Sequence, residues 1–312
     1  MKRRTFLQGA GTVMGAAAFP AGALAQTAKP TAAQARRIGM TTACFRHHLV
    51  PPIGAPVKDG PRFDLLGAPK FIKDTFGIGN IEVWSRTVPD IEIDYFQRLR
   101  TAARQAGARI SNVQIDGDYD LNAEDPARRA TSVAFVKSWM DKAKAAGAPT
   151  VRINIGGGPR GTPLRLEAAV ESIRAVAAYG RSIGVKPLVE NHGTVGAKID
   201  NVVTVIKALN DPSVGAIVDW GITEATTLED RIADISKLFP YIDIVSAKGM
   251  HFDKDNKHVE YPIEPLVRAS EAAGFRGVYS VELYAEPDYP ADTLAAAKGM
   301  VAAIASSLKS QA

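Results

Sequence analysis

The chain has 312 residues, of which 46% are hydrophobic and 23% are charged, and it carries a formal net charge of +5. This composition is typical of a soluble globular protein, and the length suits one large domain or two small ones. The single cysteine, Cys44, excludes an intrachain disulfide and a cysteine metal cluster.

The first 25 residues predict an export signal. They read MKRRTFLQGAGTVMGAAAFPAGALA, with a basic start, an Ala- and Gly-rich middle and an A-x-A ending at Ala25, as secretory signals do. The paired Arg3 and Arg4 before Thr-Phe-Leu resemble a twin-arginine (Tat) signal. The alternative is a membrane anchor, but the apolar run is short and rich in glycine for a bilayer span. We therefore expect a periplasmic or secreted protein.

The remaining chain shows no strong preference for nucleic acid or membrane. Removal of residues 1–25 takes away Lys2, Arg3 and Arg4 and no acid, so the net charge falls from +5 to +2, a weak footprint for nucleic acid. No later run is long and apolar enough to predict stable membrane insertion. Residues 26–35 are low in complexity and predict a flexible lead-in, and residues 36–312 form the predicted folded domain.

From residue 37 onward, short apolar runs alternate with longer amphipathic stretches. The runs have strand length, and most contain Val and Ile; they cover residues 37–43, 80–84, 109–115, 150–155, 186–190, 214–219, 242–247 and 277–283. The helix-like stretches cover residues 93–107, 127–147, 164–184, 201–210, 228–239, 263–274 and 291–308. The stretches that finish at Gly107, Gly147 and Gly184 end as helices often do.

This alternation predicts a single (β/α)8 TIM barrel with parallel strands and an active site at its C-terminal face. Eight strands joined by helices imply parallel β-structure with crossover helices, and roughly 275 residues suit a barrel, typically about 250 residues long. The rival is a doubly wound open sheet. That fold has the glycine fingerprint G-x-G-x-x-G after its first strand. Here the end of the first run and the residues that follow it read MTTACFRHH, which lacks the fingerprint.

Polar side chains follow the ends of most predicted strands, where the chemistry of a TIM barrel collects. In PLVENHG, residues 187–193, Glu190 and His192 are two residues apart and point to the same face of the strand. The strand-end residues, taken in chain order, are Glu82 and Trp84, Arg152 and Asn154, Glu190 and His192, Asp219, Ser246 and Lys248, and Glu282.

Three of these acids, Glu190, Asp219 and Glu282, would converge at the barrel mouth. Carboxylates that close repel one another unless something neutralises them. A divalent metal is the simplest candidate, and carboxylates with an imidazole suit Mn²⁺, Mg²⁺, Co²⁺ or Zn²⁺.

The motifs VENHG, VDWG, VSAKGMHFD and YSVELY resemble the xylose-isomerase-like superfamily of sugar isomerases and epimerases, over essentially all of the chain after the signal. The resemblance implies one divalent metal held by Glu190, Asp219, Glu282 and a histidine on the seventh strand. It also implies that the two glutamates move a proton between neighbouring carbons of a ketose.

The seventh strand departs from that pattern, because it reads Ser246-Ala247-Lys248 where relatives have histidine, one residue, then lysine. The missing ligand could be His192 or His251, or a serine hydroxyl or water could take its place. His192 could instead hold the substrate, and Lys248 could stabilise an enediolate or balance the acids.

For other candidate residues, both a functional and a structural role are open. Trp84 and Trp220 could stack on a sugar ring or cap the core, and Glu82 could bind substrate or pair with an arginine such as Arg152. Further candidates for binding substrate at the mouth are Arg152, Asn154, Ser246, His251 and His48.

The function these residues favour is a metal-assisted isomerase or epimerase. Glu190 or Glu282 would take a proton next to a carbonyl and the other would return it, while Lys248 and His192 assist. Export favours a non-phosphorylated carbohydrate substrate. A lyase or dehydratase acting on a keto-glycoside or inosose begins with the same step, and a non-catalytic periplasmic sugar-binding module is a third alternative. The oligomeric state stays open, with a homo-oligomer among the options.

Overall fold

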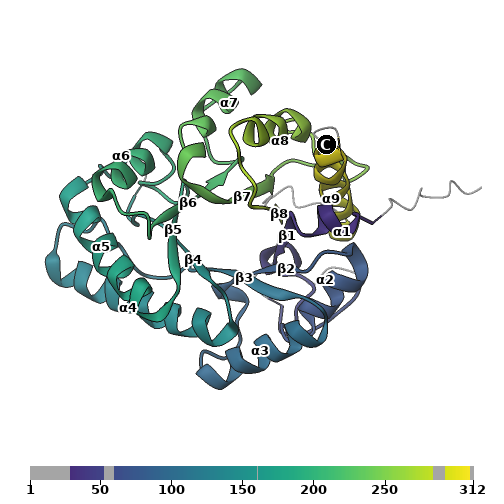
Figure 1. Cartoon of the computed structure of the whole chain (residues 1–312), viewed down its shortest axis with the longest axis horizontal. Coiled ribbons are helices and arrows are strands. Elements are labelled where there is room, and N and C mark those ends of the chain that lie inside the picture. Colours follow the sequence, from purple (N-terminus) through teal and green to yellow (C-terminus); the bar gives the residue numbers. More distant parts are fainter. Residues whose placement is uncertain (1–28, 53–59, 160, 284–291, 310–312) are drawn as a thin grey trace, which may run out of the picture.

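The computed structural model describes residues 29–52, 60–159, 161–283 and 292–309. The predicted signal peptide, residues 1–25, lies outside them. Eight parallel strands close into a barrel in the order β1 to β8, and helices surround it (Figure 1). This confirms the predicted TIM barrel and excludes the open doubly wound sheet. Among the described residues, no helix combines the length and apolar character needed to cross a bilayer.

The strands lie where the apolar runs predict them. They are β1 (Ile38–Thr41), β2 (Asn80–Trp84), β3 (Arg109–Gln114), β4 (Thr150–Ile153), β5 (Lys186–Glu190), β6 (Gly215–Asp219), β7 (Ile242–Gly249) and β8 (Val278–Leu283). The barrel closes where β1 pairs with β8, with Gly39 opposite Ser280. The absence of a side chain at Gly39 matters at this seam, because an added Cβ would lie 2.8 Å from Val278 Cγ1.

The helices connect the strands on the outside of the barrel. They are α1 (Ala32–Ala35), α2 (Ala68–Phe76), α3 (Ile93–Gln105), α4 (Pro126–Ala146), α5 (Leu166–Ile183), α6 (Ile199–Leu209), α7 (Leu228–Ser236), α8 (Ile263–Ala272) and α9 (Thr293–Lys309). Three short 3₁₀ segments accompany them, η1 (Thr42–Phe45), η2 (Ser85–Thr87) and η3 (Phe239–Tyr241). Gly147 and Gly184 end α4 and α5 in the left-handed conformation, as the sequence predicts.

Two helices differ from the sequence-based expectation. The helix α2 was not predicted from the sequence, although Gly77 ends it with φ 75°. Residues 31–35, expected to belong to the flexible lead-in, instead include α1. Thr31 caps this helix, and the side chain of Gln34 donates to the Ala305 carbonyl, 2.7 Å away, which ties α1 to α9.

The barrel interior changes from apolar to charged along the strands. Leu188, Ile217 and Ile244 form a small buried cluster apart from the main core, which lies between the strands and the helices. Side chains alternate along a strand, so residues two positions further on face the same interior. Those residues are Glu190, Asp219 and Ser246. The strand register therefore places the acids just above an apolar layer.

Candidate active site

Five charged side chains meet at the C-terminal ends of the strands. Arg152 lies on β4, Glu190 on β5, Asp219 on β6, Lys248 on β7 and Glu282 on β8. All but Glu282 are at least 97% buried, and Glu282 keeps 12% of its side chain exposed. Buried charges are tolerated only when they are paired, and here they divide into two groups.

The first group centres on Lys248. Its Nζ lies 2.6 Å from Oδ2 of Asp219 and 3.0 Å from Oε1 of Glu282. The other oxygen of Asp219 accepts the Gly221 N–H at 2.8 Å, and Ser246 Oγ lies 3.3 Å from Oε2 of Glu282. Burial alone would favour the neutral amine, but the surrounding carboxylates outweigh it and raise the pKa of Lys248. Lys248 is therefore a buried ammonium held by two acids.

The second group centres on Arg152. Its guanidinium donates to Oδ1 of Asp116 at 2.5 Å, and Trp84 Nε1 donates to the other Asp116 oxygen at 2.6 Å. Burial opposes ionisation of Asp116, but the guanidinium and the indole N–H outweigh it and hold the pKa of that carboxyl below its usual range. The Nε of Arg152 also lies 2.9 Å from Oε2 of Glu190.

Glu190 itself accepts no hydrogen bond. Both of its carboxylate oxygens are buried without a partner, and the Arg152 Nε contact lacks hydrogen-bond geometry. Burial is the main reason that the pKa of Glu190 rises to about 8, and the repulsion of Asp219 and Glu282 adds to it against the attraction of Arg152. Glu190 is thus poised to gain or lose a proton near neutral pH.

Glu282 has the opposite character. Burial would raise its pKa, but the positive charges of Lys248 and Arg152 outweigh burial and lower the pKa of Glu282 to about 2. His192 is neutral, because burial, with help from Lys248 and Arg152, lowers its pKa to about 3. Its Nδ1 is buried without a hydrogen-bond partner. The site therefore contains an ionised glutamate, a protonatable glutamate and a neutral imidazole.

These residues do not fit the metal that the sequence predicts. The predicted ligands, Glu190, Asp219, Glu282 and His192, do not form a ligand set, since no group of three or more His, Cys, Asp or Glu side chains in the described part of the chain is arranged to hold a metal ion. The physical reason is the lysine: the ammonium of Lys248 lies between the two acids that a metal would use.

Three further predicted residues lie in or next to this site. Ser246 contacts Glu282, and Trp84 contacts Asp116. The Asn154 backbone N–H donates to the Tyr119 hydroxyl, while its side-chain oxygen is buried without a partner.

Glu82 is buried within the barrel, where Asn112 donates to it at 2.7 Å. The expected arginine partner is not its hydrogen-bond partner there. Burial raises the pKa of Glu82.

Three predicted residues take structural positions instead. Trp220 is fully buried in the core against Tyr279, with ring centroids 5.8 Å apart. The structure therefore supports core packing for this residue rather than stacking on a sugar ring. His251 is half exposed and pairs with Glu260, rather than completing a metal site. His48 is buried and packs edge-on against Phe45.

Three residues that organise the site were not predicted from the sequence. Asp116 lies two residues beyond Gln114, so the alternation that links Glu190 to His192 could have found both. Gln114 donates to Glu282 at 3.2 Å. Asn191 donates to the Asp219 carbonyl and accepts the Asp219 N–H, which fixes the end of β6; no signal in the sequence pointed to that role.

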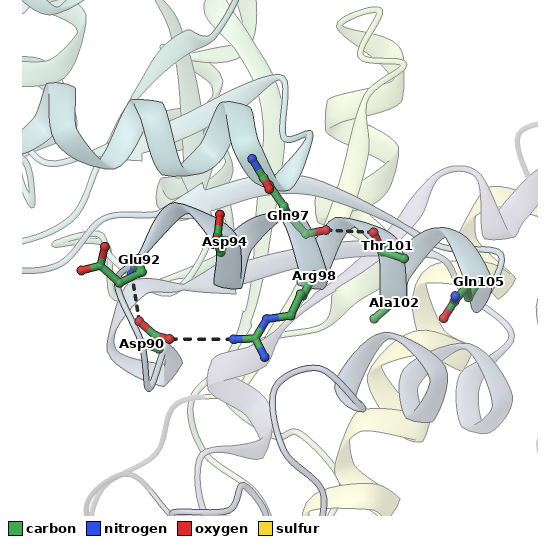
Figure 2. Close-up of a pocket in the computed structure, with 8 residues that line it drawn as sticks. All are labelled: Asp90, Glu92, Asp94, Gln97, Arg98, Thr101, Ala102 and Gln105. Carbon is green, nitrogen blue, oxygen red and sulfur yellow. Dashed lines mark hydrogen bonds and ion pairs between the residues drawn. The ribbon is translucent and has the colours of Figure 1, made fainter.

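A separate pocket of about 820 Å³ lies along α3. Figure 2 shows that polar side chains line it, with Asp90 accepting from the Glu92 N–H and paired with Arg98. Its lining residues all come from the segment between β2 and α3 and from α3 itself. None of the charged residues at the strand ends belongs to it.

Comparison with known proteins agrees with the fold. The family described as "Xylose isomerase-like TIM barrel" matches residues 72–305. No curated protein sequence is detectably similar to the chain.

Three solved structures illustrate the similarity. A xylose isomerase-like TIM barrel protein from Mycobacterium smegmatis, in complex with magnesium, is 17% identical, with a TM-score of 0.63 over 89% of this chain and 99% of that one. D-Psicose 3-epimerase with D-tagatose from Clostridium cellulolyticum is 14% identical, with a TM-score of 0.64 over 85% and 96%. A probable 3-DHS dehydratase from Bacillus anthracis is 14% identical, with a TM-score of 0.61 over 88% and 98%. At these identities the similarity shows the fold.

Proposed function

Because the chain belongs to the xylose isomerase-like TIM barrel family, we propose that it is an enzyme that isomerises or epimerises a sugar or keto-sugar. The reaction removes a proton from the carbon next to a carbonyl and returns it through an enediolate. The observation that carries this proposal is Glu190, a buried carboxylate without a hydrogen-bond donor and with a pKa of about 8. A general base works best when its pKa lies near the working pH.

The neighbouring residues have complementary roles in this proposal. Glu190 takes the proton, and negative charge then develops on the substrate oxygens. The positive charges of Lys248 and Arg152, both near enough to Glu190 to affect its pKa, stabilise that charge in a site with little water. The neutral His192 forms a hydrogen bond with a substrate hydroxyl through Nδ1. Glu282 stays ionised and holds Lys248 in place.

A non-phosphorylated substrate fits the predicted export of the protein. Phosphorylated sugars are scarce outside the cytoplasm, and residues 1–25 predict a Tat signal. One structural neighbour was solved with the free sugar D-tagatose, which agrees with this substrate class.

A lyase or dehydratase is the second candidate, acting on a keto-glycoside or inosose. The observation that favours it is the difference between the two glutamates, because only Glu190 is placed to exchange a proton near neutral pH. Elimination needs one base, after which a β-oxygen leaves. A probable dehydratase is among the proteins with the same fold.

One experiment separates these alternatives. The protein is incubated in D₂O with a panel of ketoses, keto-glycosides and inososes, and α-deuterium uptake and products are followed by NMR. We expect exchange that is lost in Glu190→Gln and kept in the control Glu171→Gln, an exposed glutamate paired with Arg129. An epimer or isomer supports the first proposal, and an unsaturated product supports the lyase. Exchange that persists in Glu190→Gln refutes Glu190 as the base, and no exchange with the whole panel favours a binding module.

A further inference from the structure

We infer that the Lys248 ammonium is the built-in cation of this barrel, and that Asp219 and Glu282 hold it in place of a divalent metal. Its Nζ contacts both carboxylates, at 2.6 and 3.0 Å. These two residues belong to the three acids that the sequence predicts as metal ligands. The third, Glu190, contacts Arg152 instead.

The surrounding chain is built to accommodate this lysine. Gly221 leaves room for its aliphatic stem, because an added Cβ would lie 3.0 Å from Lys248 Cδ and 3.1 Å from Met250 Cγ. The Tyr261 hydroxyl donates to the Lys248 carbonyl, which anchors the backbone. Lys248 also lies directly opposite Glu282 in the pairing of β7 with β8. The lysine position is therefore fixed from its backbone to its ammonium.

The local charges also oppose a metal beside the ammonium. A divalent ion bound to Asp219 and Glu282 would lie close to the positive charge of Lys248 in a buried site, where like charges repel strongly. To bind, it would have to displace an ammonium that both acids already stabilise. The acids of this barrel are thus neutralised by the chain itself, through Lys248 and Arg152.

For catalysis, this inference rests on the proposed function. It assigns to Lys248 the charge stabilisation that a metal would otherwise supply to an enediolate, while Glu190 moves the proton. Proton exchange would then need no added divalent ion and would survive treatment with a chelator.

Metal binding can be tested without a known substrate. The chelator-treated wild type, Lys248→Met and the control Lys254→Met, an exposed lysine paired with Asp255, are titrated with Mn²⁺ by calorimetry. We expect no binding to the wild type or the control. We expect Lys248→Met to bind about one Mn²⁺ per chain, at an Mn²⁺ concentration at least about 100-fold below the highest one at which the wild type shows no binding, because two carboxylates have lost their ammonium.

Two results would overturn the inference. One is stoichiometric Mn²⁺ binding by the wild type, and the other is a folded Lys248→Met that gains no Mn²⁺ binding. If Lys248→Met does not fold, the wild type still decides, since a melting temperature that Mn²⁺ raises after chelation contradicts a lysine-filled site. A chain that binds no Mn²⁺ and also exchanges no substrate proton would refute the proposed function while leaving the assignment of the cation intact.

Discussion

Glu190→Gln should stabilise the protein, and the gain should grow with pH. In the folded chain, burial raises the pKa of Glu190 from 4.5 to about 8, so folding favours the protonated carboxyl. The stability of the wild type associated with this group is fully present below pH 4.5 and is lost as the pH rises toward 8. Glutamine has nearly the same shape and carries no charge, so it avoids this loss.

The size of the effect follows from the pKa shift. Each pH unit between the pKa of the unfolded chain and that of the folded chain lowers the free energy of unfolding of the wild type by about 1.4 kcal/mol. At pH 7 the free energy of unfolding of the wild type is therefore lower by roughly 3 kcal/mol relative to Glu190→Gln, and near pH 8 it is lower by roughly 4 kcal/mol. Near pH 5 the two proteins should differ by less than about 1 kcal/mol.

Urea unfolding of both proteins at several pH values between about 5 and 8 measures this difference in the free energy of unfolding. Glu171→Gln, at an exposed position, is the matched control and should show no such trend. A difference between Glu190→Gln and the wild type that stays constant with pH would refute the raised pKa. Destabilisation by the glutamine at the upper end of the range would show that the carboxylate is paired better than its contacts indicate.

Three further predictions concern the same site. Arg152→Met should lower the free energy of unfolding by about 3–5 kcal/mol, because Asp116 and Glu190 lose their buried cation; a loss below about 1 kcal/mol in urea unfolding would contradict this pairing. Gly221→Ala should cost about 1–3 kcal/mol, because its Cβ crowds the stem of Lys248, and the same unfolding assay checks it. Under the proposed function, the rate of α-deuterium exchange should rise with pH, with a midpoint near 8, and a rate that is flat across that pH would argue against Glu190 as the base.

The fold was predictable because its signals are local. The apolar runs that predict strands are short and rich in Val and Ile, and glycine follows α4 and α5, so these local patterns located the elements. The helix α2 was harder to find, because it lies within a segment rich in Pro, Gly and aromatic residues, where tertiary packing of Phe71 and Phe76 against Phe45 supports it.

The positions of the charged residues were predictable, but their partners were not. Strand ends identify which residues reach the barrel mouth, and this located Glu190, Asp219, Lys248 and Glu282. The pairing depends on strand register, which sets Lys248 opposite Glu282 and Asp219 opposite Ser246. Two arrangements cannot be distinguished from the sequence, because both use the same carboxylates. In one, a lysine lies between two acids; in the other, three acids share a metal.

The different environments of the two glutamates also limit the chemistry. The resemblance noted in the sequence implies that both Glu190 and Glu282 move the proton between neighbouring carbons of a ketose. Here Lys248 keeps Glu282 ionised with a pKa of about 2, while burial leaves Glu190 with a pKa of about 8. Groups whose pKa values are pushed apart in this way take different roles. Under the proposed function, Glu190 alone would remove and return the proton on one face of the substrate, and an epimerisation would need a proton donor on the other face besides Glu190.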